Sequence, residues 1–258
     1  MKKELGKYLL LAAMLLMPCL LNGQGQVYTR KAKLEDFSTR TTKIVLTGLP
    51  MFDIILKEEV SSRWRISPYE FCSVSEYERF KNRSLYYFMR FAKDDDFMYL
   101  IVSKGGLENG EDPMKLAFDV IKMPIAAADN PSGQELIYMS AFIDIVQDFL
   151  VRAIESDRVA YGGLKSISRK RSTRGKLIYL GEERSTKAFE VAEEDALCGV
   201  LLQPADTGRQ TYCYKMLIGA DDHMLYYWRK QRIFSSNDRN WTATDKINFK
   251  GKIFKEKQ

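Results

Sequence analysis

One stretch of the chain decides the fold: residues 85–102, LYYFMRFAKDDDFMYLIV. Two apolar arms, Leu85–Ala92 and Phe97–Val102, flank a charged turn at Lys93–Asp96. Both arms are apolar at nearly every position, which is typical of strands that are covered on both faces. We therefore predict a β-hairpin inside a sheet that has helices packed on it.

A strand and a helix are predicted before this hairpin. The segment KIVLTG (Lys43–Gly48) is typical of a short buried strand. Pro50 suits the first position of a helix, because its missing N–H has no helical partner there. The predicted helix has an apolar face of Phe52, Ile55, Leu56, Val60 and Trp64, with Asp53, Lys57, Glu58, Ser61 and Ser62 mostly opposite.

A second strand and a short helix are predicted between this helix and the hairpin. After Pro68, the segment YEFCSV predicts a strand. Ser75 and Glu78 match a capping box, which predicts a short helix ending at Phe80. The order of elements over residues 43–102 resembles small exported α/β modules of envelope-assembly proteins, such as the amino-terminal domain of TolB. That resemblance implies a fold and no activity.

The carboxyl-terminal side of the hairpin predicts one more strand and the longest helix. Residues 114–128 favour a strand that Pro124 ends, and Gln134–Asp157 has helical periodicity. Asp148 and Arg152 are spaced for an ion pair within one helix, and the charges on this face argue against a membrane span. The apolar face contains Phe142, Ile145, Val146, Phe149, Ala153 and Ile154.

The last third of the chain is rich in predicted strands. KLIYL and ALCGVLLQP suggest two strands, and Thr211–Ile218 with His223–Lys230 forms a second hairpin. The turn of that hairpin contains DDHM, which is similar to DDFM in the first hairpin and raises the hypothesis of a duplicated unit. The final residues, TDKINFKGKIFKEKQ, favour an edge strand.

These elements predict an α/β or α+β fold with a mixed sheet of six to eight strands and two main amphipathic helices. Glycines at 162 and 163 suggest an internal boundary. We expect a signal peptide (1–23), an extended amino-terminal arm (24–42), an α/β part (43–162) and a β-rich part (163–258). The last two are either subdomains or one continuous domain.

The amino terminus is typical of an exported protein. Three lysines precede an apolar run from Tyr8 to Leu21, and its length of about 14 residues is short of the roughly 20 that a membrane helix needs. We expect cleavage before Gln24 or Gln26. Lipid attachment at Cys19 is disfavoured because Pro18 precedes it, and an uncut anchor is disfavoured by length. The leader resembles those of exported proteins of the Bacteroides group, which implies a periplasmic or outer-membrane location.

Composition excludes several classes of protein. The formal charge of +6 falls to about +4 without the leader, which is too small for a dedicated nucleic-acid binder. Hydrophobic residues make up 45% of the chain, enough for a packed core. Without Cys19, three cysteines remain, so a full disulfide framework is excluded. Cys198 and Cys213 either pair across neighbouring strands or, with Cys72, are small buried residues.

Known catalytic and cofactor motifs are absent from the sequence, which has no P-loop, no dinucleotide-binding glycine motif, no C-x-x-C and no nucleophile elbow. A single histidine, His223, excludes metal sites built from two or three imidazoles. This residue is either an exposed turn histidine or the base of a catalytic site. The acidic run Asp94–Asp96 lacks the alternate spacing of a calcium loop, so we interpret it as a solvated turn. We therefore expect no metal and no cofactor.

Two features are candidate binding sites. Six cations gather in a segment without acids, here called the basic run: Lys165, Arg169, Lys170, Arg171, Arg174 and Lys176. The basic run is either a solvated connector or a site for an anionic surface or partner, and it lacks the aromatic residues that single-stranded nucleic-acid binders use. Trp241, in the polar segment NDRNWTAT, is the best candidate for an exposed ring, although a structural staple is the alternative.

The absence of catalytic motifs favours a non-catalytic protein of the periplasm or cell envelope that binds another envelope protein or an anionic envelope component. One alternative is an envelope hydrolase with an Asp/Glu carboxylate pair, which one sequence cannot show because such pairs meet only in the fold. A second alternative is an anionic-surface binder that works through the basic run.

Overall fold

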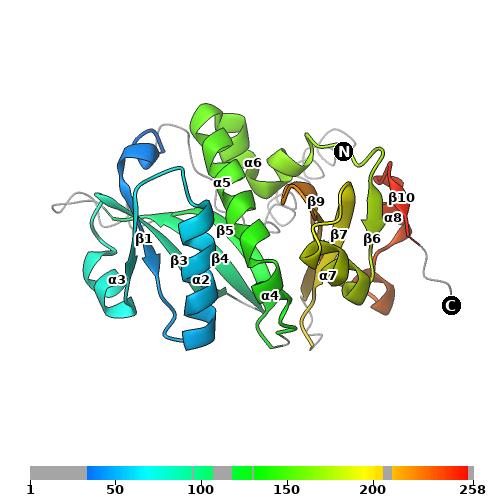
Figure 1. Ribbon diagram of the computed structural model, residues 1–258, viewed down its shortest axis with the longest axis horizontal. Helices are drawn as coiled ribbons and strands as arrows, with labels where there is room; N and C mark the ends of the chain where they lie inside the picture. Colours follow the sequence, from blue (N-terminus) through cyan, green and yellow to red (C-terminus); the bar gives the residue numbers. More distant parts are fainter. Residues whose placement is uncertain (1–33, 95, 107–117, 130, 206–210, 255–258) are drawn as a thin grey trace, which may run out of the picture.

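The computed structural model describes residues 34–94, 96–106, 118–129, 131–205 and 211–254. These residues form two mixed β-sheets of five strands each, together with seven α-helices, an α+β fold (Figure 1). The predicted fold class is confirmed. The prediction of one sheet with six to eight strands is wrong, because the strands of the two halves do not pair with each other.

The first sheet has the strand order β2-β1-β3-β4-β5. Strand β1 pairs in parallel with β2 and β3, and β3, β4 and β5 then pair antiparallel. The predicted hairpin of residues 85–102 is confirmed as β3 and β4. The strands are β1 (Thr41–Val45), β2 (Tyr69–Cys72), β3 (Tyr86–Asp94), β4 (Phe97–Lys104) and β5 (Phe118–Ala127).

Helices α2 (Pro50–Arg63) and α3 (Val74–Phe80) cover opposite faces of the first sheet. Leu56 and Val60 of α2 belong to the main core, whereas α3 packs on a small separate cluster of β-sheet residues. The helix predicted to begin at Pro50 is confirmed. Its Asp53 is buried rather than opposite the apolar face, because its carboxylate accepts hydrogen bonds from the backbone N–H groups of Thr47 and Gly48.

Three local predictions for the first half need correction. The capping box of α3 is formed by Ser73 and Glu76, two residues before the predicted pair. Strand β5 continues through Pro124, which lies at a register shift on an edge strand, where the missing N–H is tolerated. Residues 34–39 of the predicted arm are not extended, since they form a turn and the 3₁₀-helix η3 (Phe37–Thr39), with Leu34 and Phe37 buried. The leader and residues 24–33 lie outside the described residues.

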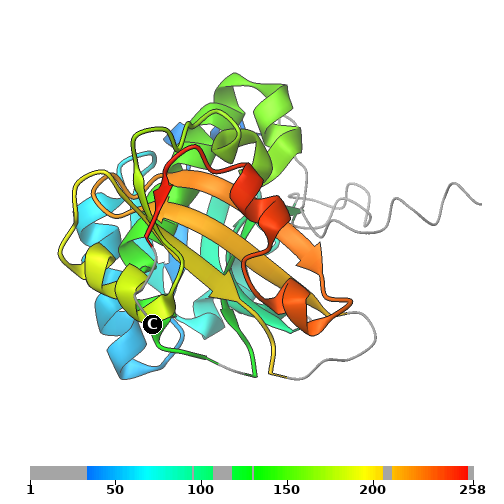
Figure 2. The same cartoon turned by 90° about the vertical axis from the view of Figure 1, so that its right-hand side faces the viewer.

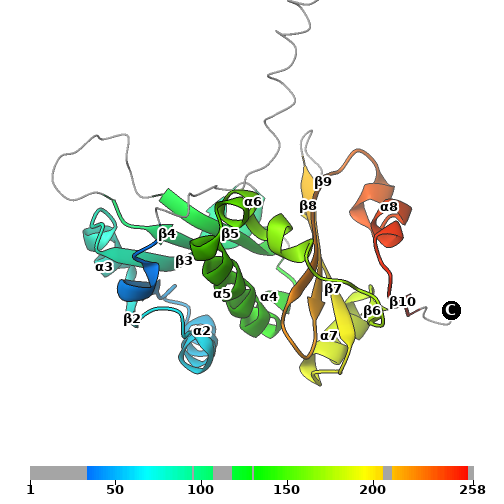
Figure 3. The same ribbon diagram turned by 90° about the horizontal axis from the view of Figure 1, so that it is seen from above.

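Three helices lie between the two sheets (Figure 3). The first two cover the range in which one long helix was predicted, and the third, which follows them, was not predicted. The predicted apolar face is confirmed, because its residues from Phe142 to Ala153 are buried and Ile154 is partly buried. The third helix is interrupted at Gly163, whose φ is 57° and ψ −153°, so the chain changes direction at the expected boundary of 162/163 and then resumes a helical course. The three helices are α4 (Gln134–Ile137), α5 (Met139–Glu155) and α6 (Asp157–Ser168).

The second sheet has the strand order β10-β6-β7-β8-β9. The predicted second hairpin is confirmed as β8 and β9, and helix α7 was not predicted. Residues 233–253, here called the C-terminal strap, cross the outer face of this sheet (Figure 2). The elements are β6 (Leu177–Tyr179), α7 (Glu182–Glu190), β7 (Ala196–Leu202), β8 (Tyr212–Gly219), β9 (Leu225–Arg232), η4 (Ser236–Arg239), α8 (Ala243–Ile247) and β10 (Lys252–Ile253).

Both sheets have the same pairing pattern: a strand with two parallel neighbours, followed by two antiparallel strands. When β1 is aligned with β6 and β3 with β7 by their first residues, Tyr99 of β4 corresponds to Tyr214 of β8. Their hydroxyl groups lie 2.9 Å apart in a hydrogen bond between the sheets. The two sheets thus contact each other through residues at corresponding positions of their strand patterns.

One hydrophobic cluster joins the halves, with members from both sheets and from α5 and α6. All three cysteines in the described residues are free and buried, so the interpretation as small buried residues is confirmed and Cys198 and Cys213 do not pair. In the part of the chain that the structure describes, no helix is long and apolar enough to cross a membrane.

Candidate functional site

His223 is the centre of a polar network where the two halves meet. It lies in the turn between β8 and β9 with a φ of 55°, a left-handed conformation that is uncommon for a residue with a side chain. Its Nδ1 is 2.8 Å from Oδ2 of Asp144 on α5, and its ring stacks on Phe189 of α7 at 5.1 Å. The side chain is 16% exposed, so the interpretation as an exposed turn histidine is wrong.

Arg63 at the end of α2 completes this network. Its Nη1 lies 2.8 Å from the same Asp144 oxygen, and its Nε donates to Glu59 at 2.6 Å. Nη1 is also 3.2 Å from Nδ1 of His223, but Nδ1 cannot accept from Arg63 while it donates to Asp144. We name Glu59, Arg63, Asp144 and His223 the junction network, because it connects α2, α5 and the β8–β9 turn.

The junction network contains two of the three parts of a hydrolytic site. A carboxylate that holds Nδ1 of a histidine leaves Nε2 to act as a base, as in Ser-His-Asp sites. Such a site also needs a nucleophile within hydrogen-bond reach of the base. Among the described residues, no serine, threonine or cysteine side chain is hydrogen-bonded to His223. The geometry therefore supports a structural junction better than a catalytic triad.

The carboxylates of the network do not form an acid–base pair. Glu59 and Asp144 both bind Arg63, so a guanidinium lies between them. In glycosidase-type pairs the two carboxylates instead face a common substrate. No group of three or more His, Cys, Asp or Glu side chains in the described residues is placed to hold a metal ion.

The basic run follows α6 and is partly neutralised. Arg171 donates to Asp148 at 3.1 Å, and Lys176 donates to Asp195 at 2.7 Å. The predicted pair of Asp148 with Arg152 is confirmed at 2.7 Å. Within the described residues the other four cations have no carboxylate partner, and all but the first of them are exposed: Lys165, Arg169, Lys170 and Arg174.

Trp241 lies in the C-terminal strap and is partly buried. Its ring packs at 5.9 Å from Phe249 and 6.3 Å from Tyr227, and it comes so close to Gly199 that a Cβ there would lie 3.1 Å from the indole. The ring therefore serves as a staple between the strap and the second sheet, which was the alternative to an exposed ring.

No family model, curated protein or solved structure matches this chain.

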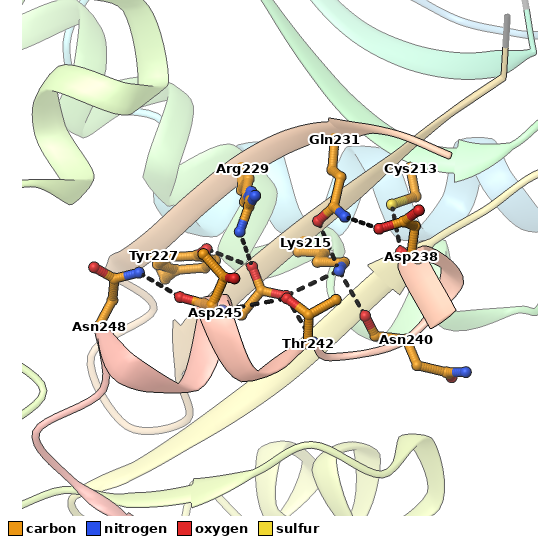
Figure 4. A network of polar contacts seen from close by, with 11 residues as sticks. Cys213, Lys215, Tyr227, Arg229, Gln231, Asp238, Asn240, Thr242, Asp245 and Asn248 are labelled. Atoms are coloured by element: carbon orange, nitrogen blue, oxygen red, sulfur yellow. Dashed lines mark hydrogen bonds and ion pairs between the residues drawn. The ribbon is translucent and has the colours of Figure 1, made fainter. Parts of the chain in front are cut away.

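A fully buried ion pair fastens the C-terminal strap (Figure 4). The side chains of Lys215 on β8 and Asp245 on α8 are both 0% exposed, and they meet at 2.9 Å. Nζ of Lys215 also donates to Gln231 and to the carbonyl oxygen of Asn240, so each of its three N–H groups has an acceptor. This lysine is occupied by its bonds and is not placed as a nucleophile.

Asp245 is the centre of the same network. It accepts from Tyr227 and Arg229 at 2.7 Å and from the backbone and hydroxyl of Thr242. Burial alone would raise the pKa of Asp245, but the hydrogen bonds from Lys215, Tyr227 and Thr242 outweigh it and hold that pKa well below its usual range. The network thus keeps a charged carboxylate inside the protein and holds the strap in place.

The first turn of α2 carries the most prominent apolar surface of the first half. Leu49, Met51 and Ile54, here named the α2 tip, are 63%, 70% and 58% exposed. Met51 and Ile54 are three residues apart and so lie on one face of the helix. The inward turn of Asp53 orients this face toward solvent. The sequence pattern did not indicate the α2 tip, because its three residues belong to neither the apolar nor the polar face of the predicted helix.

Proposed function

We propose that this chain is an exported, non-catalytic protein of a Gram-negative cell envelope that binds another envelope protein. The α2 tip carries the proposal. Clustered apolar side chains in contact with water have a free-energy cost that is recovered when a partner covers them, and such patches mark interaction sites. The amino-terminal leader supports export, and the absence of catalytic motifs supports a binding role.

The position of the α2 tip in the fold also supports binding. Three residues separate Leu49 from the last residue of β1, so the tip lies at the carboxyl end of that strand. In open α/β sheets ligands bind outside the carboxyl ends of the strands, where neighbouring connections run in opposite directions. Here β1 is followed by α2 on one face and β2 by α3 on the other. Apolar side chains at this place suit an apolar surface of a partner protein.

Photo-crosslinking in the native host tests this proposal. A benzoylphenylalanine label replaces Met51 in one strain and Ser62 in a second, because Ser62 is an exposed residue at the other end of the same helix. We expect one discrete adduct with an envelope protein from the Met51 label and none from the Ser62 label. Ile54→Glu should remove the Met51 adduct without changing the amount of folded protein. Equal labelling from both positions, or an adduct that survives Ile54→Glu, would contradict the proposal.

The basic run supports a second candidate function, binding to an anionic surface. Three of its unpaired cations are exposed within six residues, Arg169, Lys170 and Arg174. Each cation near an acidic bilayer contributes about 1 kcal/mol, so Arg169→Glu with Lys170→Glu should weaken binding to phosphatidylglycerol vesicles more than about tenfold. The control, Lys57→Glu with Lys187→Glu, lowers the net charge equally at exposed sites elsewhere. Binding that salt does not weaken, or equal losses in both variants, would remove this candidate.

A further inference from the structure

Strand β2 is an open edge of the first sheet. It pairs only with β1 in the strand order. The carbonyl groups of Pro68 and Cys72 accept bonds from β1 and from the residue directly after it, at 2.8 and 2.9 Å. Because backbone groups alternate in direction along a strand, those of Tyr69 and Phe71 point away from β1. Within the described residues, no hydrogen bond from outside the ladder to β1 reaches the N–H or C=O of these two residues. Such groups are a template for another strand.

The side chains of Tyr69 and Phe71 form an aromatic surface beside this edge, here called the aromatic ledge. Tyr69 and Phe71 are partly buried, pack against the main core and lie on the same face of β2, with ring centroids 5.7 Å apart. At the start of β2 this ledge continues into an open hollow of about 710 Å³. Its lining includes Trp64, Ser67 and Pro68. An added strand would place every second side chain over the ledge and the hollow.

The opposite face of β2 is charged. Glu70 is about half exposed and binds Lys43 of β1. A residue of an added strand on this face would lie beside Glu70, where a basic side chain is favoured and an acidic one is not. The edge therefore offers two kinds of specificity, apolar on one face and acidic on the other.

The other edge strand of the first sheet, β5, is more deeply buried and lacks one backbone donor. Strand β5 is closed in by the core, since Val120, Ile121, Met123 and Ile125 are at most 3% exposed. It also contains Pro124, which cannot donate to a ladder. In β2, by contrast, only Cys72 is buried. Of the two edges of the first sheet, β2 is thus the open one.

We infer that β2 binds an extended segment of another protein as an added strand. Main-chain hydrogen bonds to Tyr69 and Phe71 hold the segment, and its specificity comes from alternate apolar side chains over the aromatic ledge with a basic residue beside Glu70. The edge and the α2 tip belong to different elements, and the inference does not depend on the function proposed for the α2 tip.

Phe71→Pro tests the main-chain bonds directly. The N–H of Phe71 points outward, so proline removes a donor that the added strand needs and leaves the ladder to β1 intact. Phe71→Leu is the matched control, because it keeps that donor and an apolar side chain. Circular dichroism and thermal unfolding of both variants establish that they remain folded.

The probe is a displayed library of random peptides of about ten residues, long enough for one strand. It is selected on the full protein alone, so that binding to Phe71→Pro remains an independent test. We expect enriched peptides with apolar residues at every second position, and the synthetic peptides should slow amide hydrogen exchange at Tyr69 and Phe71 at least about tenfold. Methylating alternate backbone nitrogens of the peptide should abolish binding, because it removes the ladder donors.

Three results would overturn the inference. The first is that enriched peptides bind Phe71→Pro as tightly as Phe71→Leu. The second is that the N-methylated peptides bind as well as the unmodified ones. The third is that exchange slows elsewhere but not at Tyr69 and Phe71. Glu70→Lys gives an independent check, since it should turn the selected preference from basic to acidic residues beside position 70.

Discussion

At the scale of single residues, the least expected finding is the role of His223. Its partner Asp144 is 79 positions away in sequence, and Arg63 is 160 away. Nothing in the local pattern of either segment indicates such a contact, because polar side chains on a turn and on the solvent face of a helix are ordinary. Its left-handed backbone is equally hidden in sequence. The side chains of the junction network could therefore be named from sequence, but not brought together.

Asp144→Ala should destabilise the protein by about 1–2 kcal/mol. The change removes the shared acceptor of Arg63 and His223, and the value allows for partial solvent exposure of the group. Urea unfolding at pH 7 measures the loss. Glu155→Ala is the control, since Glu155 is exposed on the same helix and its replacement should change stability by less than about 0.5 kcal/mol. Equal effects of the two substitutions would show that the junction network contributes little.

The lowered pKa of Asp245 should make the free energy of unfolding depend on pH in the acid range. A carboxylate whose pKa is lower in the folded than in the unfolded protein stabilises the folded state. This contribution is complete at pH values above the unfolded pKa of about 4. This contribution is lost as the pH falls from there toward the folded pKa. Asp245→Asn should therefore unfold more easily at pH 7, by about 3–5 kcal/mol, because Lys215 then lacks its counter-ion.

The acid dependence separates this charge effect from simple loss of packing. Between about pH 5 and pH 2, the free energy of unfolding should fall less steeply for Asp245→Asn than for the natural protein. Urea unfolding across this range measures the slopes. Tyr227→Phe is a milder variant that removes one hydrogen bond to the carboxylate and should give an intermediate slope. Parallel slopes in all three proteins would contradict the low pKa of Asp245.

At the scale of elements, the start of α3 separates the sequence prediction from the structure. Sequence favours Ser75 as the cap, but the hydroxyl of Ser73 accepts the N–H of Glu76. Ser73→Ala should therefore lower the free energy of unfolding by about 1 kcal/mol, and Ser75→Ala should leave it almost unchanged. Thermal and urea unfolding of the two variants decide between the positions. A larger loss from Ser75→Ala would place the start of the helix at the predicted residue.

Helices and strands could be predicted from sequence where their buried residues repeat at a regular spacing. Both hairpins and α2 satisfy this condition, because their apolar residues repeat as strands or helices require. Helix α7 does not, since EERSTKAFE is mostly polar and buries only Ser185, Ala188 and Phe189. Strand β5 contains a proline that usually ends a strand, and only its edge position permits it. The elements that sequence patterns did not predict are those whose burial depends on contacts with distant parts of the chain.

At the scale of the whole molecule, the sequence signal for duplication came from the wrong place. The similar tetrapeptides DDFM and DDHM lie in the β3–β4 and β8–β9 turns, and these turns are not equivalent when the two sheets are aligned. The two sheets share their strand pairing order instead, and Tyr99 and Tyr214 lie at corresponding positions of it. This correspondence is set by backbone pairing between strands that are distant in sequence, so the residues alone could not indicate it.

The two halves should unfold together. A chain of this length often unfolds in steps, but here one hydrophobic cluster spans both sheets and the helices between them. Trp64→Phe leaves two tryptophans, Trp228 and Trp241, both in the second half, so fluorescence then reports that half alone. The urea midpoint from this fluorescence should coincide with that from far-ultraviolet circular dichroism, which reports the whole protein.

The reverse reporter, Trp228→Phe with Trp241→Phe, should give the same agreement for the first half. Separate midpoints would show that each sheet folds as its own unit, and that the contact of Tyr99 with Tyr214 joins two independent domains.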